Sequence, residues 1–181
     1  MGSEAHCLTP QTVVDGEKSR MRRLEDGIQI NASRSVVWGI LSDFSGVATW
    51  APYLRSSSPV GDVESGVGAY RVMRHFWGFR LEESVIDWDE GNGYAFEVVT
   101  VPFPIKDVRE TWQIVTDGEG VSVRTSVEYD THLGPLGGAL DSVLVSHLVR
   151  REMRDGLKGL KRHAEADAMK ASAVAPEALM E

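Results

Sequence analysis

Three charged residues fall among apolar residues in a region of strand-like alternation, and they are the main candidates for chemistry. Arg74, Glu83 and Glu110 share a predicted sheet face with apolar side chains, where a charge is costly unless it is paired. As functional groups, Arg74 would anchor a ligand carboxylate or enolate, and burial would raise the pKa of Glu83 or Glu110 for acid–base chemistry. Alternatively, they form an internal Arg–Glu pair, or a register shift of one residue turns them outward.

Other polar residues are weaker candidates. His75 and Arg109 fall on the opposite face and become candidates only if the register slips, and His147 is more typical of a helix surface or a satisfied core position than of a catalytic base. The histidines lack ligand spacing and Cys7 is the single cysteine, so we expect no metal and no cofactor. No Gly-x-Ser-x-Gly motif is present, and Gly66-Val67-Gly68 fits a hairpin turn better than a phosphate loop. Without a catalytic motif, enzymatic activity is left open.

Two predicted hairpins position these charged residues. A turn at Trp77-Gly78 gives the pairs Phe76 with Phe79, Arg74 with Leu81, Val72 with Glu83 and Tyr70 with Val85. A turn within residues 117–120 gives the pairs Ile114 with Val123, Trp112 with Thr125, Glu110 with Val127 and Val108 with Tyr129. Each hairpin has one apolar face, and residues 93–101 form a further strand between the two hairpins.

Segments with helical periodicity precede and follow these strands in the sequence. After a first strand over 23–30, Ser33 is a natural N-cap for a short helix, and a second helical stretch ends before Pro52. Residues 136–164 predict one long helix. Val145, Val149 and Met153 lie along one side, and Leu140, Leu144 and Leu148 form a second apolar side near its start. The first half of this helix should therefore be buried on two sides or border a cavity.

Length and charge limit the remaining possibilities. The 181 residues predict one domain over 22–164 with flexible tails at 1–21 and 165–181. The net charge of −8 disfavours nucleic acid as a partner. No apolar run is long enough for stable membrane insertion, and the lone cysteine fits a reducing compartment. We therefore expect a cytoplasmic protein.

The order of the predicted elements and the amino-acid sequences of several segments are similar to those of a known superfamily. The chain resembles the START-like helix-grip proteins, also called SRPBCC, and within them the polyketide cyclase/dehydrase and lipid-transport-like branch. The resemblance is carried by Ile30-Asn31-Ala32-Ser33, Val36-Val37-Trp38, Leu41-Ser42-Asp43-Phe44, Trp50, Gly66-Val67-Gly68-Ala69-Tyr70-Arg71, Glu83, Asp87-Trp88, Trp112 and Gly134. It implies an α+β fold: a curved antiparallel sheet wrapped around a long C-terminal helix, with two short helices after the first strand.

This resemblance also implies a cavity between the sheet and the long helix. Joined to the predicted apolar face, it gives a set of ligand-binding candidates: Tyr70, Val72, Arg74, Phe76, Leu81, Glu83, Phe96, Phe103, Glu110, Trp112, Tyr129, Leu140, Leu144 and His147. The alternative is that the apolar members simply fill a solid core.

Three functions fit these features. The first is binding, with or without transport, of a small hydrophobic or amphipathic molecule such as a lipid, isoprenoid or polyketide. The second is a cyclase or dehydratase that moves protons with polar cavity residues. The third is a stress-response or chaperone-cofactor module. It would use the outer sheet surface and a basic stretch of the helix, including Arg150, Arg151 and Arg154, which could make weak contact with an anionic surface or an acidic protein.

Overall fold

A computed structural model of the protein describes residues 21–117, 120–132 and 144–174. Its core is a seven-stranded antiparallel sheet in the order β1-β7-β6-β5-β4-β3-β2. The elements are β1 (Arg22–Ile30), α1 (Arg34–Ser42), the 3-10 helix η1 (Phe44–Thr49), β2 (Leu54–Val60), β3 (Tyr70–His75), β4 (Arg80–Asp89), β5 (Gly93–Thr100), β6 (Ile105–Asp117), β7 (Gly120–Thr131) and α3 (Ser146–Val174).

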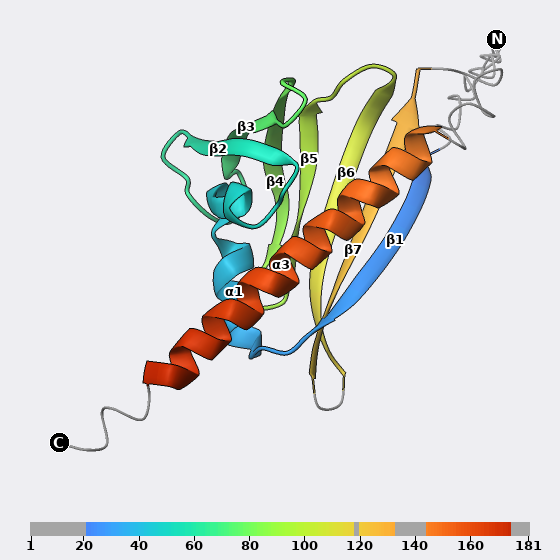
Figure 1. Ribbon diagram of the computed structural model, residues 1–181. Helices are drawn as coiled ribbons and strands as arrows, with labels where there is room; N and C mark the ends of the chain where they lie inside the picture. The colour runs from blue at the N-terminus through green and yellow to red at the C-terminus, as the bar shows by residue number, and fades with distance from the viewer. Residues whose placement is uncertain (1–20, 118–119, 133–143, 175–181) are drawn as a thin grey trace, which may run out of the picture.

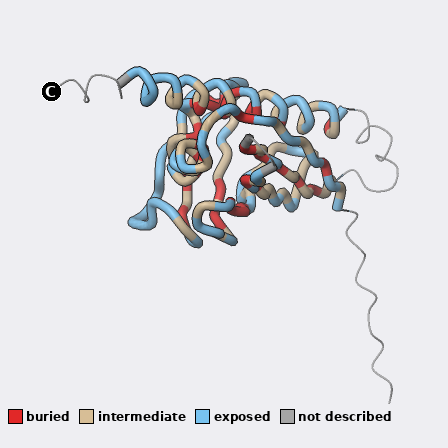
Figure 2. The backbone as a smooth tube through the Cα atoms, turned by 90° about the horizontal axis from the view of Figure 1, so that it is seen from below, coloured by how far each residue is buried: buried red, intermediate tan, exposed pale blue. Residues whose placement is uncertain are grey.

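The long helix α3 crosses the concave side of the curved sheet (Figure 1). Figure 2 shows buried positions concentrated where α3 faces the strands. Met153, Leu157, Leu160 and Ala164 are all buried along this side of the helix, as its apolar spacing predicts. The predicted α+β helix-grip architecture is confirmed.

The short helices follow the capping signals of the sequence. Ser33 caps α1, because its Oγ accepts a hydrogen bond from the N–H of Val36 at 3.3 Å. Asp43 is similarly the N-cap of η1, because its side chain accepts a hydrogen bond from the N–H of Gly46 at 2.9 Å. Val37, Leu41 and Phe44 are buried against the main core cluster, so both short helices close one end of the sheet.

A glycine on α3 brings the segment after η1 close to the helix. A Cβ placed on Gly159 would lie 1.9 Å from the carbonyl oxygen of Trp50, a separation that no real Cβ shows. Gly156, one turn earlier, faces the hydroxyl of Tyr53 with less crowding. The two glycines therefore let residues 50–53 pack directly on the helix.

The β3–β4 register differs from the prediction by one residue. Tyr70 pairs with Ser84, Arg71 with Glu83 and Met73 with Leu81. The hairpin has a three-residue loop, since the N–H of His75 donates to the carbonyl of Phe79 at 3.0 Å and Gly78 adopts a φ of 94°. One extra loop residue turns every β3 side chain to the other face, so the predicted pairing about Trp77-Gly78 is wrong.

The β6–β7 register matches the prediction over most of its length. Ile114 pairs with Val123, Trp112 with Thr125 and Glu110 with Val127. The predicted Val108–Tyr129 pair falls in a bulge: the register shifts by one residue between Lys106 and Arg109, so Asp107 and Val108 together lie opposite Tyr129. Asp107 in this bulge has a φ of 50°.

The long helix extends further along the chain than its apolar pattern predicts. It continues to Val174, through the first ten residues of the segment where a flexible tail was predicted, because residues 165–174 contain no proline or glycine. Leu140, Gly134 and the rest of 133–143 lie outside the described residues. No helix in the described part of the chain is both long enough and apolar enough to cross a membrane.

Candidate functional site

A cavity of about 140 Å³ lies between the concave face of the sheet and α3. Most of its lining is apolar. It includes Val47 and Leu54 next to the short helices, Met73, Leu81, Phe96 and Val98 on the central strands, Val108 and Val127 on β6 and β7, and Leu148, Val149 and Met153 on α3. A concave apolar site with a few polar groups is typical of a small-molecule pocket.

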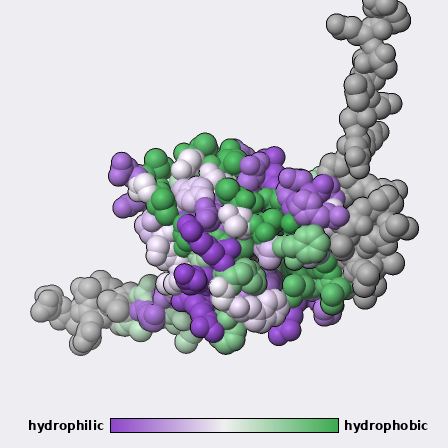
Figure 3. Space-filling view, turned by 90° about the horizontal axis from the view of Figure 1, so that it is seen from above, coloured by the Kyte–Doolittle hydropathy of each residue, from purple (hydrophilic) through white to green (hydrophobic). Residues whose placement is uncertain are grey.

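One end of this cavity is bordered by loops. Val101 and Pro102 in the β5–β6 loop and Leu148 near the start of α3 belong to its lining. Figure 3 views the molecule from this side and shows hydrophobic side chains gathered among hydrophilic ones. Phe103 and Trp77, in the β5–β6 and β3–β4 loops, are 77% and 61% exposed.

The first polar group of the cavity is a buried ion pair between adjacent strands. Nε of Arg71 donates to Oε2 of Glu83 at 2.7 Å, and a second guanidinium nitrogen contacts the same carboxylate. Arg71 also donates to the carbonyl of Phe44, and its Cζ lies 3.8 Å from the centre of the Phe44 ring. The pKa of Glu83 is raised above its usual value, because the effect of burial exceeds the opposing effect of the Arg71 guanidinium.

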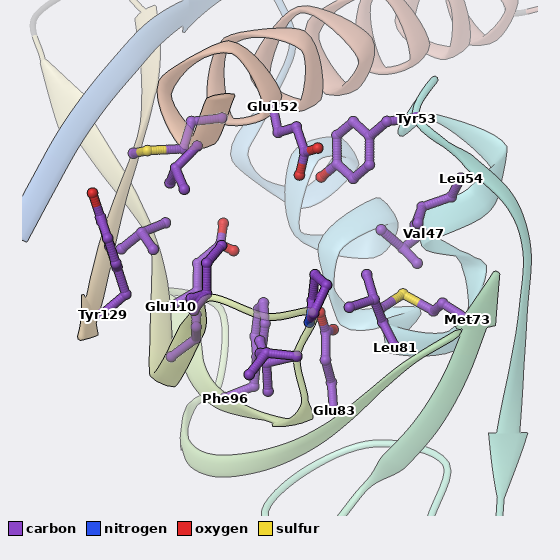
Figure 4. Close-up of a pocket in the computed structure, with 18 of the residues that line it drawn as sticks. Val47, Tyr53, Leu54, Met73, Leu81, Glu83, Phe96, Glu110, Tyr129 and Glu152 are labelled. Atoms are coloured by element: carbon purple, nitrogen blue, oxygen red, sulfur yellow. The ribbon is translucent and has the colours of Figure 1, made fainter. Parts of the chain in front are cut away.

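The second polar group is the Glu110 carboxyl on β6. Thr125 on β7 donates a hydrogen bond to its Oε1 at 3.0 Å. Burial, helped by the negative charge of Glu83, raises the pKa of Glu110 to about 7. In Figure 4 the carboxyl points from the sheet into the cavity, toward α3. A carboxyl with this pKa can accept or give a proton near neutral pH.

The third polar group comes from the helix side. Glu152 on α3 points into the cavity, and the hydroxyl of Tyr53 lies beside it (Figure 4). Burial, with a smaller contribution from Asp155, raises the pKa of Glu152 to about 7. The pKa of Tyr53 is raised well above its usual value, first by burial and then by the nearby carboxylates. Two carboxyls therefore reach the same cavity from opposite sides.

His75 supports Glu152 from the end of β3. Its Nε2 lies 3.2 Å from Oε1 of Glu152, and its Nδ1 accepts the N–H of Trp77 at 3.1 Å. The proton of the neutral ring is therefore on Nε2, which donates to Glu152. The imidazole stacks on Phe79 with ring centres 4.2 Å apart, and burial lowers its pKa.

Some of the predicted site residues line the cavity in the structure, and others lie on the surface or on the other face of the sheet. Leu81, Glu83, Phe96, Glu110, Trp112 and Tyr129 line the cavity. Tyr70, Val72, Arg74 and Phe76 do not, since the three-residue loop turns their strand over, and Arg74 and Phe76 are exposed. Arg74 therefore cannot act in the cavity. His147 and Leu144 are also exposed on the helix, and Phe103 projects outward from its loop. Of the two residues expected at the surface, Arg109 is exposed, whereas His75 is only 2% exposed because the β3 register differs from the prediction by one residue.

Three polar residues of the site were missed. Arg71 takes the place expected of Arg74, and only the loop length distinguishes the two registers. Glu152 had a usable signal, because it follows Leu140, Leu144 and Leu148 at a spacing of four and extends the same helix side. Tyr53 had none, since its position depends on how the chain leaves η1.

Part of the basic stretch of α3 is paired within the protein. Arg154 contacts Asp26 on β1 at 3.1 Å, and Lys161 contacts Glu165 at 2.9 Å. Arg151 lies 3.7 Å from Asp155. These contacts weaken the sequence argument for an anionic docking patch, because part of the positive charge is already neutralised.

Comparison with solved structures places the fold among known helix-grip proteins. Ara h 8.0201 superposes with a TM-score of 0.65 and 14% identity, covering 81% of this chain and 99% of that one. Major latex-like protein 151 of Panax ginseng gives 0.62 and 17%, covering 82% and 97%. The protein TTHA0849 of Thermus thermophilus gives 0.65 and 22%, covering 81% and 99%. These likenesses establish the fold.

Comparison of the sequence itself gives the family. A search of curated proteins finds no match. The family described as polyketide cyclase/dehydrase and lipid transport matches residues 21–165, a span that contains every cavity-lining residue. The chain therefore belongs to the polyketide cyclase/dehydrase and lipid-transport family.

Proposed function

We propose that this protein binds a small hydrophobic or amphipathic molecule in the cavity between the sheet and α3. The observation that carries the proposal is the cavity itself, which is lined mainly by aliphatic and aromatic side chains yet receives Glu110, Glu152 and Tyr53. Apolar burial would supply most of the affinity, at about 25 cal/mol per Å² removed from water. Family membership supports a small ligand.

The polar groups favour an amphipathic ligand over a pure hydrocarbon. Glu110 and Glu152 direct their carboxyls into the cavity. A polar group left without a hydrogen-bond partner by a bound hydrocarbon costs about 1–3 kcal/mol, whereas a polar group on the ligand would supply a partner. The ligand should therefore combine an apolar body with at least one hydrogen-bonding group.

The cavity volume limits the ligand that enters without rearrangement. An apolar cavity of about 150 Å³ holds one benzene-sized molecule, and the volume found is about 140 Å³. A lipid or polyketide chain would require displacement of side chains or of the β5–β6 loop. A one-ring probe is therefore the appropriate first test.

The test uses 2-phenylethanol, a neutral one-ring molecule, in an NMR titration of the amide resonances. We expect saturable shifts at cavity residues such as Phe96 and Val127, with a millimolar or tighter dissociation constant. Native mass spectrometry of the purified protein should also show a co-purifying apolar molecule. Absence of saturable shifts at the cavity would contradict the proposal.

Two neighbouring valines of β5 provide a matched pair of variants. Val98 lines the cavity, whereas Val99 is 58% exposed on the other face. Val98→Phe should fill part of the cavity and weaken binding of 2-phenylethanol by about tenfold, while Val99→Phe should leave it within about twofold. Equal effects of the two substitutions would place the ligand elsewhere.

Glu110 favours a second candidate function, proton transfer on the bound molecule. Its carboxyl faces the cavity, and burial raises its pKa to about 7, as a general acid or base requires. Once a substrate is found, Glu110→Gln should abolish turnover even when the substrate is saturating. Retained turnover in this variant would remove the enzyme hypothesis in this form.

A further inference from the structure

The described lining of the cavity contains more carboxyl groups than cationic groups, and these groups differ in whether they are free to contact a ligand. Among the residues that the structure describes, its lining contains one cationic side chain, Arg71, and three carboxyl groups, on Glu83, Glu110 and Glu152. They come from β3, β4, β6 and α3, so the excess of carboxyls belongs to the whole cavity and not to one strand. The cavity should therefore favour positive over negative ligand groups.

The single cation of this lining is already engaged by the protein. Arg71 donates from Nε to Glu83 at 2.7 Å and from another nitrogen to the carbonyl of Phe44. Its guanidinium also stacks on the Phe44 ring at 3.8 Å and lies 5.3 Å from the centre of the Phe96 ring. A ligand carboxylate would have to break the Arg71–Glu83 pair and leave Glu83 buried without its counter-charge.

Glu110 and Glu152, in contrast, direct their carboxyls into the cavity. They approach from the sheet and from the helix, and the Tyr53 hydroxyl lies beside Glu152 (Figure 4). The groups that hold them are neutral donors. Thr125 donates to Glu110 at 3.0 Å, and His75 contacts Glu152 at 3.2 Å. Both carboxyls are therefore positioned to accept hydrogen bonds from a bound molecule.

We infer that the ligand carries a protonated amine, which binds beside Glu110 and Glu152 while its apolar body occupies the rest of the cavity. This inference rests on the proposed binding function and narrows it to apolar or aromatic amines. An ammonium group supplies three donors and one positive charge, which match two carboxylates and a tyrosine hydroxyl. Charge-assisted hydrogen bonds of this kind are about twice as strong as neutral ones.

The proton balance of the cavity supports the same conclusion. Burial raises the pKa of both Glu110 and Glu152 to about 7, so each is partly protonated at neutral pH. An ammonium ion beside them would lower both pKa values and release protons. The charged groups that face Glu110 are Arg71 on β3, Glu83 on β4 and Glu152 on α3. The charged groups that act on Glu152 are Asp155 and Arg151 on its own helix. Arg71 is paired with Glu83 and Arg151 lies 3.7 Å from Asp155, so among the described residues no Arg or Lys forms an ion pair with Glu110 or Glu152.

Three probes of the same size test the charge preference at pH 8. They are 2-phenylethylamine, which carries an ammonium group, 2-phenylethanol, which is neutral, and phenylacetate, which is anionic. We expect the amine to bind at least tenfold more tightly than the alcohol, and phenylacetate to bind more weakly than the alcohol. Calorimetry at pH 7 in two buffers of different ionisation enthalpy should also show proton release with the amine alone.

Conservative variants test whether Glu110 and Glu152 are responsible for the preference for the amine. Glu110→Gln and Glu152→Gln should each weaken binding of 2-phenylethylamine by about tenfold and leave 2-phenylethanol within about twofold. Glu97→Gln on β5 is the matched control, because Glu97 is exposed on the opposite face of the sheet. It should leave binding of both probes unchanged.

The outcomes separate the two proposals. If 2-phenylethanol binds in the cavity but the amine binds no more tightly, or phenylacetate binds best, the amine inference is overturned and the binding function stands. If none of the three probes binds, the binding function itself fails. If the Gln variants do not fold, the order of the three probes on the wild-type protein and the calorimetric proton release decide the inference.

Discussion

Arg71 and Glu83 lie directly opposite each other on β3 and β4, and their side chains form an ion pair that is 4% and 8% exposed. The pair lies in the lining of the cavity and beneath the Phe44 ring. It therefore joins the sheet to the segment that begins η1. Because the pair is buried in the cavity lining, the β3–β4 register determines both the stability of this region and which charged residues reach the cavity.

Removing one member of this pair should be costly. Arg71→Met leaves Glu83 buried without its partner, so we expect a loss of about 3–5 kcal/mol in the free energy of unfolding, measured by urea denaturation. The double variant Arg71→Met/Glu83→Leu should be more stable than the single variant, because no unpaired charge is left. Arg80→Met is the control. The Arg80–Glu82 pair is 57% exposed at Arg80, and its loss should cost less than about 1 kcal/mol. A double variant that is less stable than Arg71→Met would contradict this account.

Gly159 should tolerate no side chain. Gly159→Ala places a methyl group 1.9 Å from the Trp50 carbonyl oxygen, so α3 and the segment after η1 must separate, at a cost of about 1–3 kcal/mol. Gly39 on α1 is the matched control, since a Cβ there meets nothing within 4 Å. Gly39→Ala should stabilise the protein by up to about 1 kcal/mol through helix propensity. Thermal unfolding of both variants measures the contrast, and equal shifts of Tm would refute it.

Glu110 should make the protein less stable as pH rises. Its pKa is about 7 in the folded protein, against about 4.5 for an ordinary Glu. Between these values the folded state binds more protons than the unfolded state, so stability present below about pH 4.5 is lost as pH rises through about 7. The loss is about 3 kcal/mol at most.

Urea unfolding of the wild type and Glu110→Gln between pH 5 and 8 tests this titration. The variant lacks the carboxyl, so its stability relative to the wild type should increase with pH over this range. Glu97→Gln should run parallel to the wild type. Parallel curves for Glu110→Gln would mean that Glu110 titrates normally in the folded protein.

His75 should be a neutral histidine with its proton on Nε2. The Trp77 N–H donates to Nδ1, which excludes a proton there, and burial lowers the pKa of the ring below 6.5. Long-range ¹H–¹⁵N NMR correlation should show this tautomer at pH 7, and titration should give a pKa below 6.5. A proton on Nδ1 would show that the Trp77 hydrogen bond is absent in solution.

The β6–β7 hairpin shows how far the sequence alone could go. Its pairing from Glu110 to Ile114 was predicted correctly, because polar residues occupy every second position of β7 and only two residues separate Asp117 from its partner Gly120. The same reasoning was wrong for β3, where Phe76 and Trp77 are apolar but belong to the loop. Both registers give an alternating strand, and only the three-residue loop ending at Gly78 selects between them.

The sequence by itself determined the order of elements, the capping of α1 by Ser33 and the apolar side of α3, because these depend on local periodicity and short-range hydrogen bonds. The tertiary structure decided which charges are buried and which groups meet. Tyr53, Glu110 and Glu152 are far apart in the chain and converge only when α3 packs across the sheet. Alternation assigns side chains to two faces, but the choice of face and the distance between faces depend on loop length and helix packing.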